Sequence, residues 1–150
     1  KAKVTVLSNS TQIHREDVFN ALMKVDNALM KLDTVSEEYI QLVDQPTGKY
    51  NIDSIVSHLK KMNGHCIIQT MFMKGNITNS KGERISVDNC SDEYIQPYIK
   101  ALRTINPKKV MIYTLDREWP TYGLEKASIE TMDEIAEKIR NAGFVTSVSY

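Results

Sequence analysis

The chain has 150 residues, which suits one domain that buries roughly two-thirds of the surface its unfolded chain would expose. Lys+Arg and Asp+Glu are equal at 19 each, so no net charge would attract nucleic acid or an anionic membrane. The longest apolar runs are of strand length, which excludes a transmembrane helix, and two cysteines are too few for a disulfide framework, so we predict a cytoplasmic domain without membrane contact.

Apolar, β-branched runs of strand length recur along the chain and predict five strands. These runs are Val4–Leu7, Ala28–Leu32, Cys66–Met73, Val110–Leu115 and Phe144–Val148. The segments between them have apolar residues at helical spacing, and a capping box from Thr34 to Glu37 predicts the start of one helix. The last helix is the clearest. It has Ser128 as its N-cap and an inward face made of Ile129, Met132, Ile135, Ala136 and Ile139.

Strands that are apolar on both faces and separated by helices indicate a parallel sheet of right-handed βαβ units. The predicted fold class is therefore α/β, a parallel βα repeat of about five strands in a single domain over residues 1–150. The stretch from Gly75 to Cys90 directly follows a strand and is predicted to be one long irregular loop. An open doubly wound sheet and part of a barrel would both give this pattern.

Polar residues follow the first four predicted strands where each strand ends. The clusters are Ser8-Asn9-Ser10, Lys31 with Asp33, Gln69 to Lys74, and Asp116-Arg117. Ligands in parallel α/β folds bind outside the carboxyl ends of the strands, so these clusters predict one site along one rim. Lys31 and Asp33 are two residues apart and point to the same side of a strand, where two charges need each other or a ligand. An alternative is that Asp33 caps the helix near Ser36.

The strand ends together resemble the radical SAM superfamily. LSNST is similar to the TNG-type signature that ends the third barrel strand of those enzymes, and ALMKLDTVSEEYIQLVDQP resembles their fourth strand and the segment after it. VMIYTLDREWP and SIETMDEIAEKIRNAGF resemble the sixth strand and the trailing helix of the branch that contains wybutosine-type tRNA-modifying enzymes and related iron–sulfur oxidoreductases. The order and spacing of these segments carry the resemblance, which covers nearly the whole chain.

The resemblance implies a (β/α)6 partial TIM barrel that holds a [4Fe-4S] cluster through a CxxxCxxC loop and cleaves S-adenosylmethionine reductively to a radical. This sequence has neither the CxxxCxxC motif nor the glycine-rich second-strand motif. We therefore expect the chain to be the C-terminal part of such a core, namely strands three to six plus a helix and a strand. Its missing N-terminal part would supply the cluster ligands, so we expect no metal ligand here and no activity from this part alone.

The resemblance also implies roles for individual residues. Those expected to face the cofactor are Ser8, Asn9, Ser10, Lys31, Asp33, Gln69 and Tyr113. Asp116 and Arg117 are expected to face the substrate, which could be a small molecule, a protein or a tRNA.

Two other interpretations remain open at this point, a stand-alone flavodoxin-like ligand-binding or regulatory domain and a fragment of a (β/α)8 barrel enzyme. If two strands are missing, Val4–Leu7 is a bare sheet edge, and such an edge predicts self-association.

Overall fold

We analysed a computed structural model, which describes residues 2–116 and 123–150. Its central sheet has the order β1-β2-β3-β5-β7, and every neighbouring pair in it is parallel. The five strands are β1 (Thr5–Ser8), β2 (Asn27–Lys31), β3 (Cys66–Thr78), β5 (Lys109–Thr114) and β7 (Thr146–Ser149). These strands confirm the predicted parallel α/β fold.

The spatial order of the parallel strands is the same as their order along the chain. A flavodoxin-like sheet reverses direction at a switch point, with the strand order 2-1-3-4-5, and this sheet has no such reversal. A sheet that always advances in one direction keeps its crossover helices on one face, as in a barrel. The strand order therefore argues against the flavodoxin-like interpretation.

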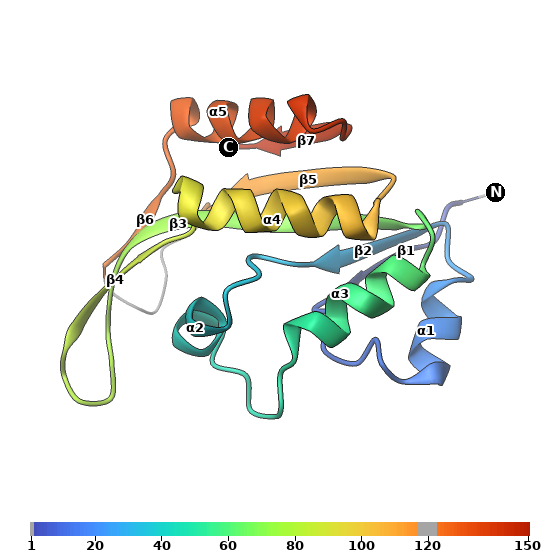
Figure 1. Cartoon of the computed structure of the whole chain (residues 1–150), viewed down its shortest axis with the longest axis horizontal. Helices are drawn as coiled ribbons and strands as arrows, with labels where there is room; N and C mark the ends of the chain where they lie inside the picture. The colour runs from blue at the N-terminus through green and yellow to red at the C-terminus, as the bar shows by residue number, and fades with distance from the viewer. Residues whose placement is uncertain (1, 117–122) are drawn as a thin grey trace.

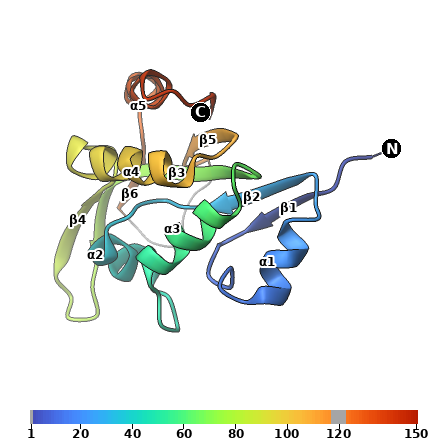
Figure 2. The ribbon, with the colours of Figure 1, turned by 45° about the vertical axis from the view of Figure 1, so that its right-hand side comes forward.

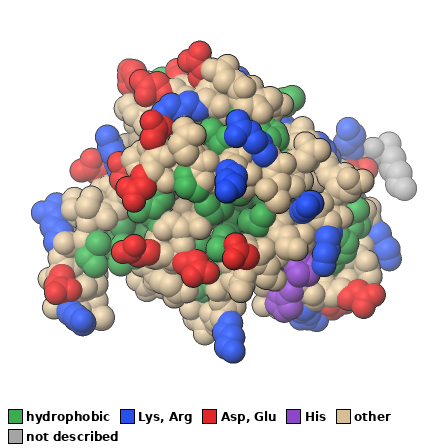
Figure 3. Space-filling view, in the orientation of Figure 1, with side chains coloured by type: hydrophobic (Ala, Val, Ile, Leu, Met, Phe, Trp, Pro, Cys, Tyr) green, Lys and Arg blue, Asp and Glu red, His purple; other side chains and the backbone are tan. Residues whose placement is uncertain are grey.

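Five helices and one π-helical turn lie between the described strands. They are α1 (Glu16–Leu22), α2 (Glu37–Tyr39), η1 (Ile40–Asp44), α3 (Ile52–Lys61), α4 (Asp92–Ile105) and α5 (Ile129–Asn141). In Figures 1 and 2, α3 and α4 lie next to each other in front of the sheet, and α5 lies beside β7. On this helix-covered side, acidic and basic side chains are interspersed (Figure 3).

The strands alternate between a face packed under the helices and a face that is half-exposed. Ala28, Met30, Ile68, Val110 and Ile112 are buried with apolar residues of α1, α3, α4 and α5 in the main core. Residues of the opposite parity form what we call the open face, which consists of Leu29, Lys31, Gln69, Met71, Met111 and Tyr113. The sheet is therefore covered by α1, α3, α4 and α5 on one side, while on the other side the open face is half-exposed and α2 and η1 pack near Met71.

The prediction of an irregular loop from Gly75 to Cys90 is wrong, because most of this stretch belongs to a β-hairpin. β3 runs on to Thr78, and β4 (Arg84–Asp88) pairs with it antiparallel. The short β6 (Leu124–Lys126) pairs antiparallel with the other edge of β3. Apolar residues of the hairpin pack on α2 in a second core of Tyr39, Met73, Ile77, Val87 and Leu115.

Two predicted helix details need correction. The first is the N-cap of α2, which is Ser36 rather than Thr34, because Ser36 Oγ accepts a hydrogen bond from the N–H of Tyr39. The second is Ile129, which was expected to face inward but is 57% exposed at the first position of α5. Ser128 does cap α5, and the rest of its predicted apolar face, Met132, Ile135, Ala136 and Ile139, is buried. No helix in the described part of the chain has the length and apolar character needed to cross a bilayer.

The outer edge of β1 pairs with no strand of residues 2–116 or 123–150, and the residues Val4 and Leu7 are 55% and 59% exposed. Unpaired backbone groups beside exposed apolar side chains favour pairing with another chain. We expect the protein to self-associate, with light scattering giving a mass above 17.1 kDa at high concentration. Leu7→Lys places a charge at this edge and should lower that mass. A strictly monomeric wild-type chain would contradict the prediction.

Candidate functional site

The parallel register brings predicted site residues from three strands onto the open face. Lys31 on β2 lies beside Gln69 on β3, which in turn lies beside Met111 on β5. Two residues further along, Met71 lies beside Tyr113. Lys31, Gln69 and Tyr113 are each half-buried; Lys31 and Tyr113 lie near the carboxyl ends of β2 and β5, and Gln69 lies where the pairing of β3 with β2 ends. The structure thus places these three residues in one polar area.

Asp33 is held at the end of β2 by charge and by the backbone. Its Oδ2 lies 3.5 Å from Nζ of Lys31, and its Oδ1 accepts a 2.7 Å hydrogen bond from the N–H of Met71. The side chain of Asp33 is only 11% exposed, against 31% for Lys31. The role of helix cap belongs to Ser36, so the geometry favours the interpretation in which Asp33 pairs with Lys31.

The charges of this pair respond to burial and to each other. Burial raises the pKa of Asp33, while the ammonium of Lys31 and the N–H of Met71 act in the opposite direction. Burial also disfavours charge on Lys31, but the Asp33 carboxylate and Tyr113 outweigh it, so the pKa of Lys31 is raised. Lys31 therefore holds its proton more strongly than a free lysine does. A further positive group nearby would stabilise the charged form of Asp33.

The loop after β1 is tied to the same strand end. Oγ of Ser10 donates a 2.8 Å hydrogen bond to the carbonyl of Lys31, and Ser10 is fully buried. Its φ of 67° lies in the left-handed region, which glycine adopts more easily than serine. Ser8 Oγ accepts from the N–H of Ser10, and exposed Asn9 accepts from the N–H and the hydroxyl of Thr11. The loop thus packs on β2, although Ser8 and Asn9 make local turn contacts.

The predicted substrate-facing pair is only partly described. Asp116 lies just past β5 and is exposed to solvent. Arg117 lies outside the described residues. The roles of both remain predictions.

Three residues near Asp33 were not predicted from the sequence. Tyr39 is 3% exposed, and its hydroxyl has no hydrogen-bond partner in the described part of the chain. Although part of Asp44 is exposed, burial and then the charge of Asp33 raise the pKa of its carboxyl to about 6. Burial, followed by Asp44 and Asp33, raises the pKa of Tyr50 to about 12. The only sequence signal was that all three closely follow the Lys31-Asp33 segment.

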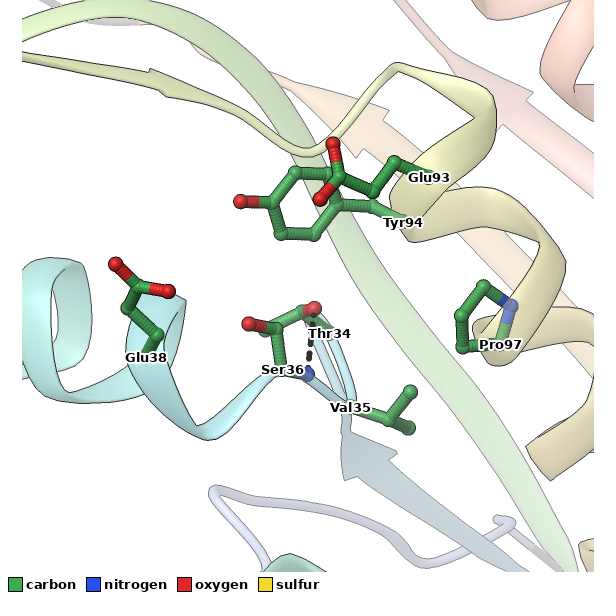
Figure 4. A pocket seen from close by; sticks show the side chains of 7 residues that line it. All are labelled: Thr34, Val35, Ser36, Glu38, Glu93, Tyr94 and Pro97. Atoms are coloured by element: carbon green, nitrogen blue, oxygen red, sulfur yellow. Dashed lines mark hydrogen bonds between the residues drawn. The ribbon is translucent and has the colours of Figure 1, made fainter.

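Two cavities lie beside the segments that follow β1 and β2. One of about 170 Å³ lies between α2 and α4, where Glu38 and Glu93 approach from opposite helices beside Tyr94 (Figure 4). The other is about 560 Å³ and is lined by Asn9 and the β1–α1 loop on one side and by the Asp44–Tyr50 segment on the other. Small-molecule sites usually measure roughly 300–1,000 Å³, so only the larger of these two has room for a nucleoside-sized ligand.

Metal ligands do not gather in the described part of the chain. Residues 2–116 and 123–150 contain no group of three His, Cys, Asp or Glu side chains that could hold an ion. Burial raises the thiol pKa of Cys66 to about 11 and that of Cys90 to about 12, which disfavours the thiolate that binds iron. These residues do not fit an iron–sulfur cluster, and no step through one is assigned to them.

Comparison with solved structures identifies the fold. The chain superimposes on a radical SAM methyltransferase from Sphaerobacter thermophilus with a TM-score of 0.71 and 14% identity, covering 97% of this chain and 40% of that one. A domain of pyruvate-formate lyase-activating enzyme from Bacteroides vulgatus gives 0.66 and 12%, covering 98% and 82%. SuiB from Streptococcus suis, bound to S-adenosylmethionine, gives 0.65 and 14%, covering 99% and 33%. No family model and no curated protein matches the chain.

The chain therefore has the α/β fold of the partial barrel in these radical SAM enzymes, and it spans less than half the length of two of the three. At this level of identity the likeness establishes the fold alone.

Proposed function

We propose that this chain is part of a radical SAM enzyme core and that its open face and strand ends bind S-adenosylmethionine and face the substrate. The observation that carries the proposal is the match of nearly the whole chain to three such enzymes, one of them bound to S-adenosylmethionine. The charged pair Lys31–Asp33 lies at a strand end of that fold, where ligands of parallel α/β folds bind.

The donor set fits the cofactor chemically. S-adenosylmethionine carries an ammonium, a carboxylate, a sulfonium and ribose hydroxyls. Asp33 would accept hydrogen bonds from a positive or hydroxyl group, and Lys31 would pair with a carboxylate. Tyr113 and the loop Ser8–Ser10 would border the adenosine, and Gln69 would offer an amide to either part. When bound to its cluster, the cofactor supplies a 5′-deoxyadenosyl radical.

The rest of the proposal concerns the parent protein. The cluster ligands would come from an N-terminal part of the same chain that carries CxxxCxxC. The resemblance of the segments VMIYTLDREWP and SIETMDEIAEKIRNAGF favours the wybutosine-type branch and iron–sulfur oxidoreductase chemistry, with Asp116 and Arg117 towards the substrate. The solved relatives named above include a methyltransferase and an activating enzyme, so the reaction class rests on that resemblance alone.

The test uses the parent protein. We expect a CxxxCxxC motif within about 100 residues upstream, from two βα units of barrel-like length. The anaerobically reconstituted parent should show cluster absorbance and, once reduced, convert S-adenosylmethionine to 5′-deoxyadenosine and methionine. The 150 residues alone, treated in the same way, should do neither. Stoichiometric iron and sulfide on these residues alone would place the cluster here and overturn this assignment.

A further inference from the structure

β3 changes partners along its length on the side where Asp33 lies. It pairs with β2 through Gln69 and with β4 from Lys74 onward. Between these two stretches, the N–H and C=O of Met71 and the N–H of Met73 face a gap between strands. Unpaired backbone groups in a buried place are costly, so side chains must complete the ladder there.

Asn89, directly after β4, fills most of that gap. Its Nδ2 donates to the carbonyl of Met71 at 2.8 Å and to the carbonyl of Asp33 at 3.0 Å. Its Oδ1 accepts from the N–H of Met73 at 2.9 Å. Asn89 is 1% exposed, so these bonds are shielded from water. Its side-chain amide thus takes the place of a peptide group of a neighbouring strand.

Asp33 completes the same ladder from the other side. Its Oδ1 accepts the N–H of Met71, while its own carbonyl accepts one of the two Asn89 N–H groups. Asn89 therefore holds both the backbone of Asp33 and the strand segment against which the Asp33 carboxylate rests. Leu32 is held to β3 by its own bonds to Gln69 and Thr70, so without the two bonds donated by Asn89 it is the backbone of Asp33 that would be free to move away from Met71.

We propose that Asn89 is a positioning residue that locks Asp33 in place, so that the β3–β4 hairpin sets the orientation of the charged pair. The functional part of this inference rests on the function proposed above for Asp33. The structural part, in which Asn89 fixes Asp33 through hydrogen bonds within the chain, does not depend on that function. The two can therefore be tested separately.

The substitution Asn89→Asp distinguishes the acceptor role of the amide from its donor role. It keeps the oxygen that accepts from the N–H of Met73 and removes both N–H donors. We expect hydrogen exchange at the N–H of Met73 to stay slow in this variant. Exchange at the N–H of Met71 should rise at least about tenfold, since its acceptor Asp33 is released. Ile68, in the middle of the parallel sheet, should not change. Asn89→Ala should expose Met71 and Met73 together.

A second readout follows the Asp33 carboxyl by carbon-13 NMR. The groups that act on this carboxyl are Lys31, Asp44, the N–H of Met71 and the hydroxyls of Tyr39, Tyr50 and Tyr98. In Asn89→Ala, water entry should lower its pKa towards the ordinary value, because burial is what raises it. Asn79→Ala is the matched control, since Asn79 is also an amide in this hairpin but binds Lys81 and Glu83 at its exposed tip. It should leave both readouts at Asp33 and Met71 unchanged.

The proposal fails if Asn89→Asp keeps Met71 as protected as in the wild type, because the acceptor alone would then suffice. It also fails if that variant raises exchange equally at Ile68, which would make Asn89 a general structural residue. If Asn89→Ala does not fold, hydrogen exchange at Met71 in Asn89→Asp still tests the proposal. These measurements require no cofactor. A failure of the parent protein to bind S-adenosylmethionine would therefore overturn the proposed function but not the positioning role of Asn89.

Discussion

In the complete parent protein, we expect Asp33→Asn to weaken S-adenosylmethionine binding about 10- to 100-fold. A hydrogen bond to a charged group contributes about 1.5–3 kcal/mol, and this substitution removes the charge. The amide oxygen can still accept the N–H of Met71, so the fold should survive. Calorimetric titration of the reconstituted enzyme gives the affinity, and a thermal melt checks the fold.

Two further variants complete this experiment. Asp33→Ala should weaken binding similarly and should also lower stability by about 1–3 kcal/mol, because the N–H of Met71 loses its acceptor in a buried place. Asp17→Asn is the control, since Asp17 is an exposed carboxylate paired with Arg15 on α1. If Asp33→Asn leaves the affinity unchanged but lowers the melting temperature, Asp33 is structural only.

The second large effect is expected at Gly75, where the backbones of β3 and the segment leading into β6 approach each other closely. Gly75 has a φ of +136°, and a Cβ there would overlap the carbonyl oxygen of Gly123. The N–H of Asn76 donates to that same carbonyl at 2.7 Å. The backbones at Gly75 and Gly123 therefore cannot move apart without breaking this hydrogen bond. Gly75→Ala should therefore lower the free energy of unfolding by about 2–6 kcal/mol, combining backbone strain and overpacking.

The chain offers two matched controls for denaturant titration of Gly75→Ala. Gly82 at the hairpin tip has a φ of +80° with open space around its missing Cβ, so Gly82→Ala should cost only about 1–2 kcal/mol of strain. Gly48 also has open space and needs no positive φ, so Gly48→Ala should be close to neutral. If Gly75→Ala is no less stable than Gly82→Ala, the two backbones at Gly75 and Gly123 can move apart to accommodate a Cβ, and the prediction is wrong.

The parallel sheet could be predicted from sequence because its signals are local. Runs such as Val110–Leu115 are apolar on both faces, and the segments between the runs have apolar residues at helical spacing. The hairpin was missed although Arg84–Asp88 alternates polar and apolar residues, because the flanking Gly75, Asn76 and Asn79 are typical of loops. The propensities of single residues do not show that a strand can continue through a glycine, here one that the close approach of a neighbouring backbone requires.

The candidate site was predictable only in part for a different reason. Lys31 and Asp33 stand out because charges two apart on a strand share a side, and the structure shows them as an ion pair. Asn89 has no such signal, because its three partners lie on β3 and after β2 and become neighbours only in the folded protein. Tyr39 and Asp44 likewise matter through burial, which sequence spacing alone does not give.

β3 pairs with four strands, two of which precede or adjoin it in the chain while two follow much later. During synthesis, β2 and the hairpin partner β4 are available early, and they can cover one edge of β3. The other edge has to wait until β5 and then β6 leave the ribosome. Contacts between distant parts of a chain form slowly, and an uncovered strand edge is prone to aggregation in the meantime. The central position of β3 therefore leaves one of its edges incompletely covered until residue 126 has emerged.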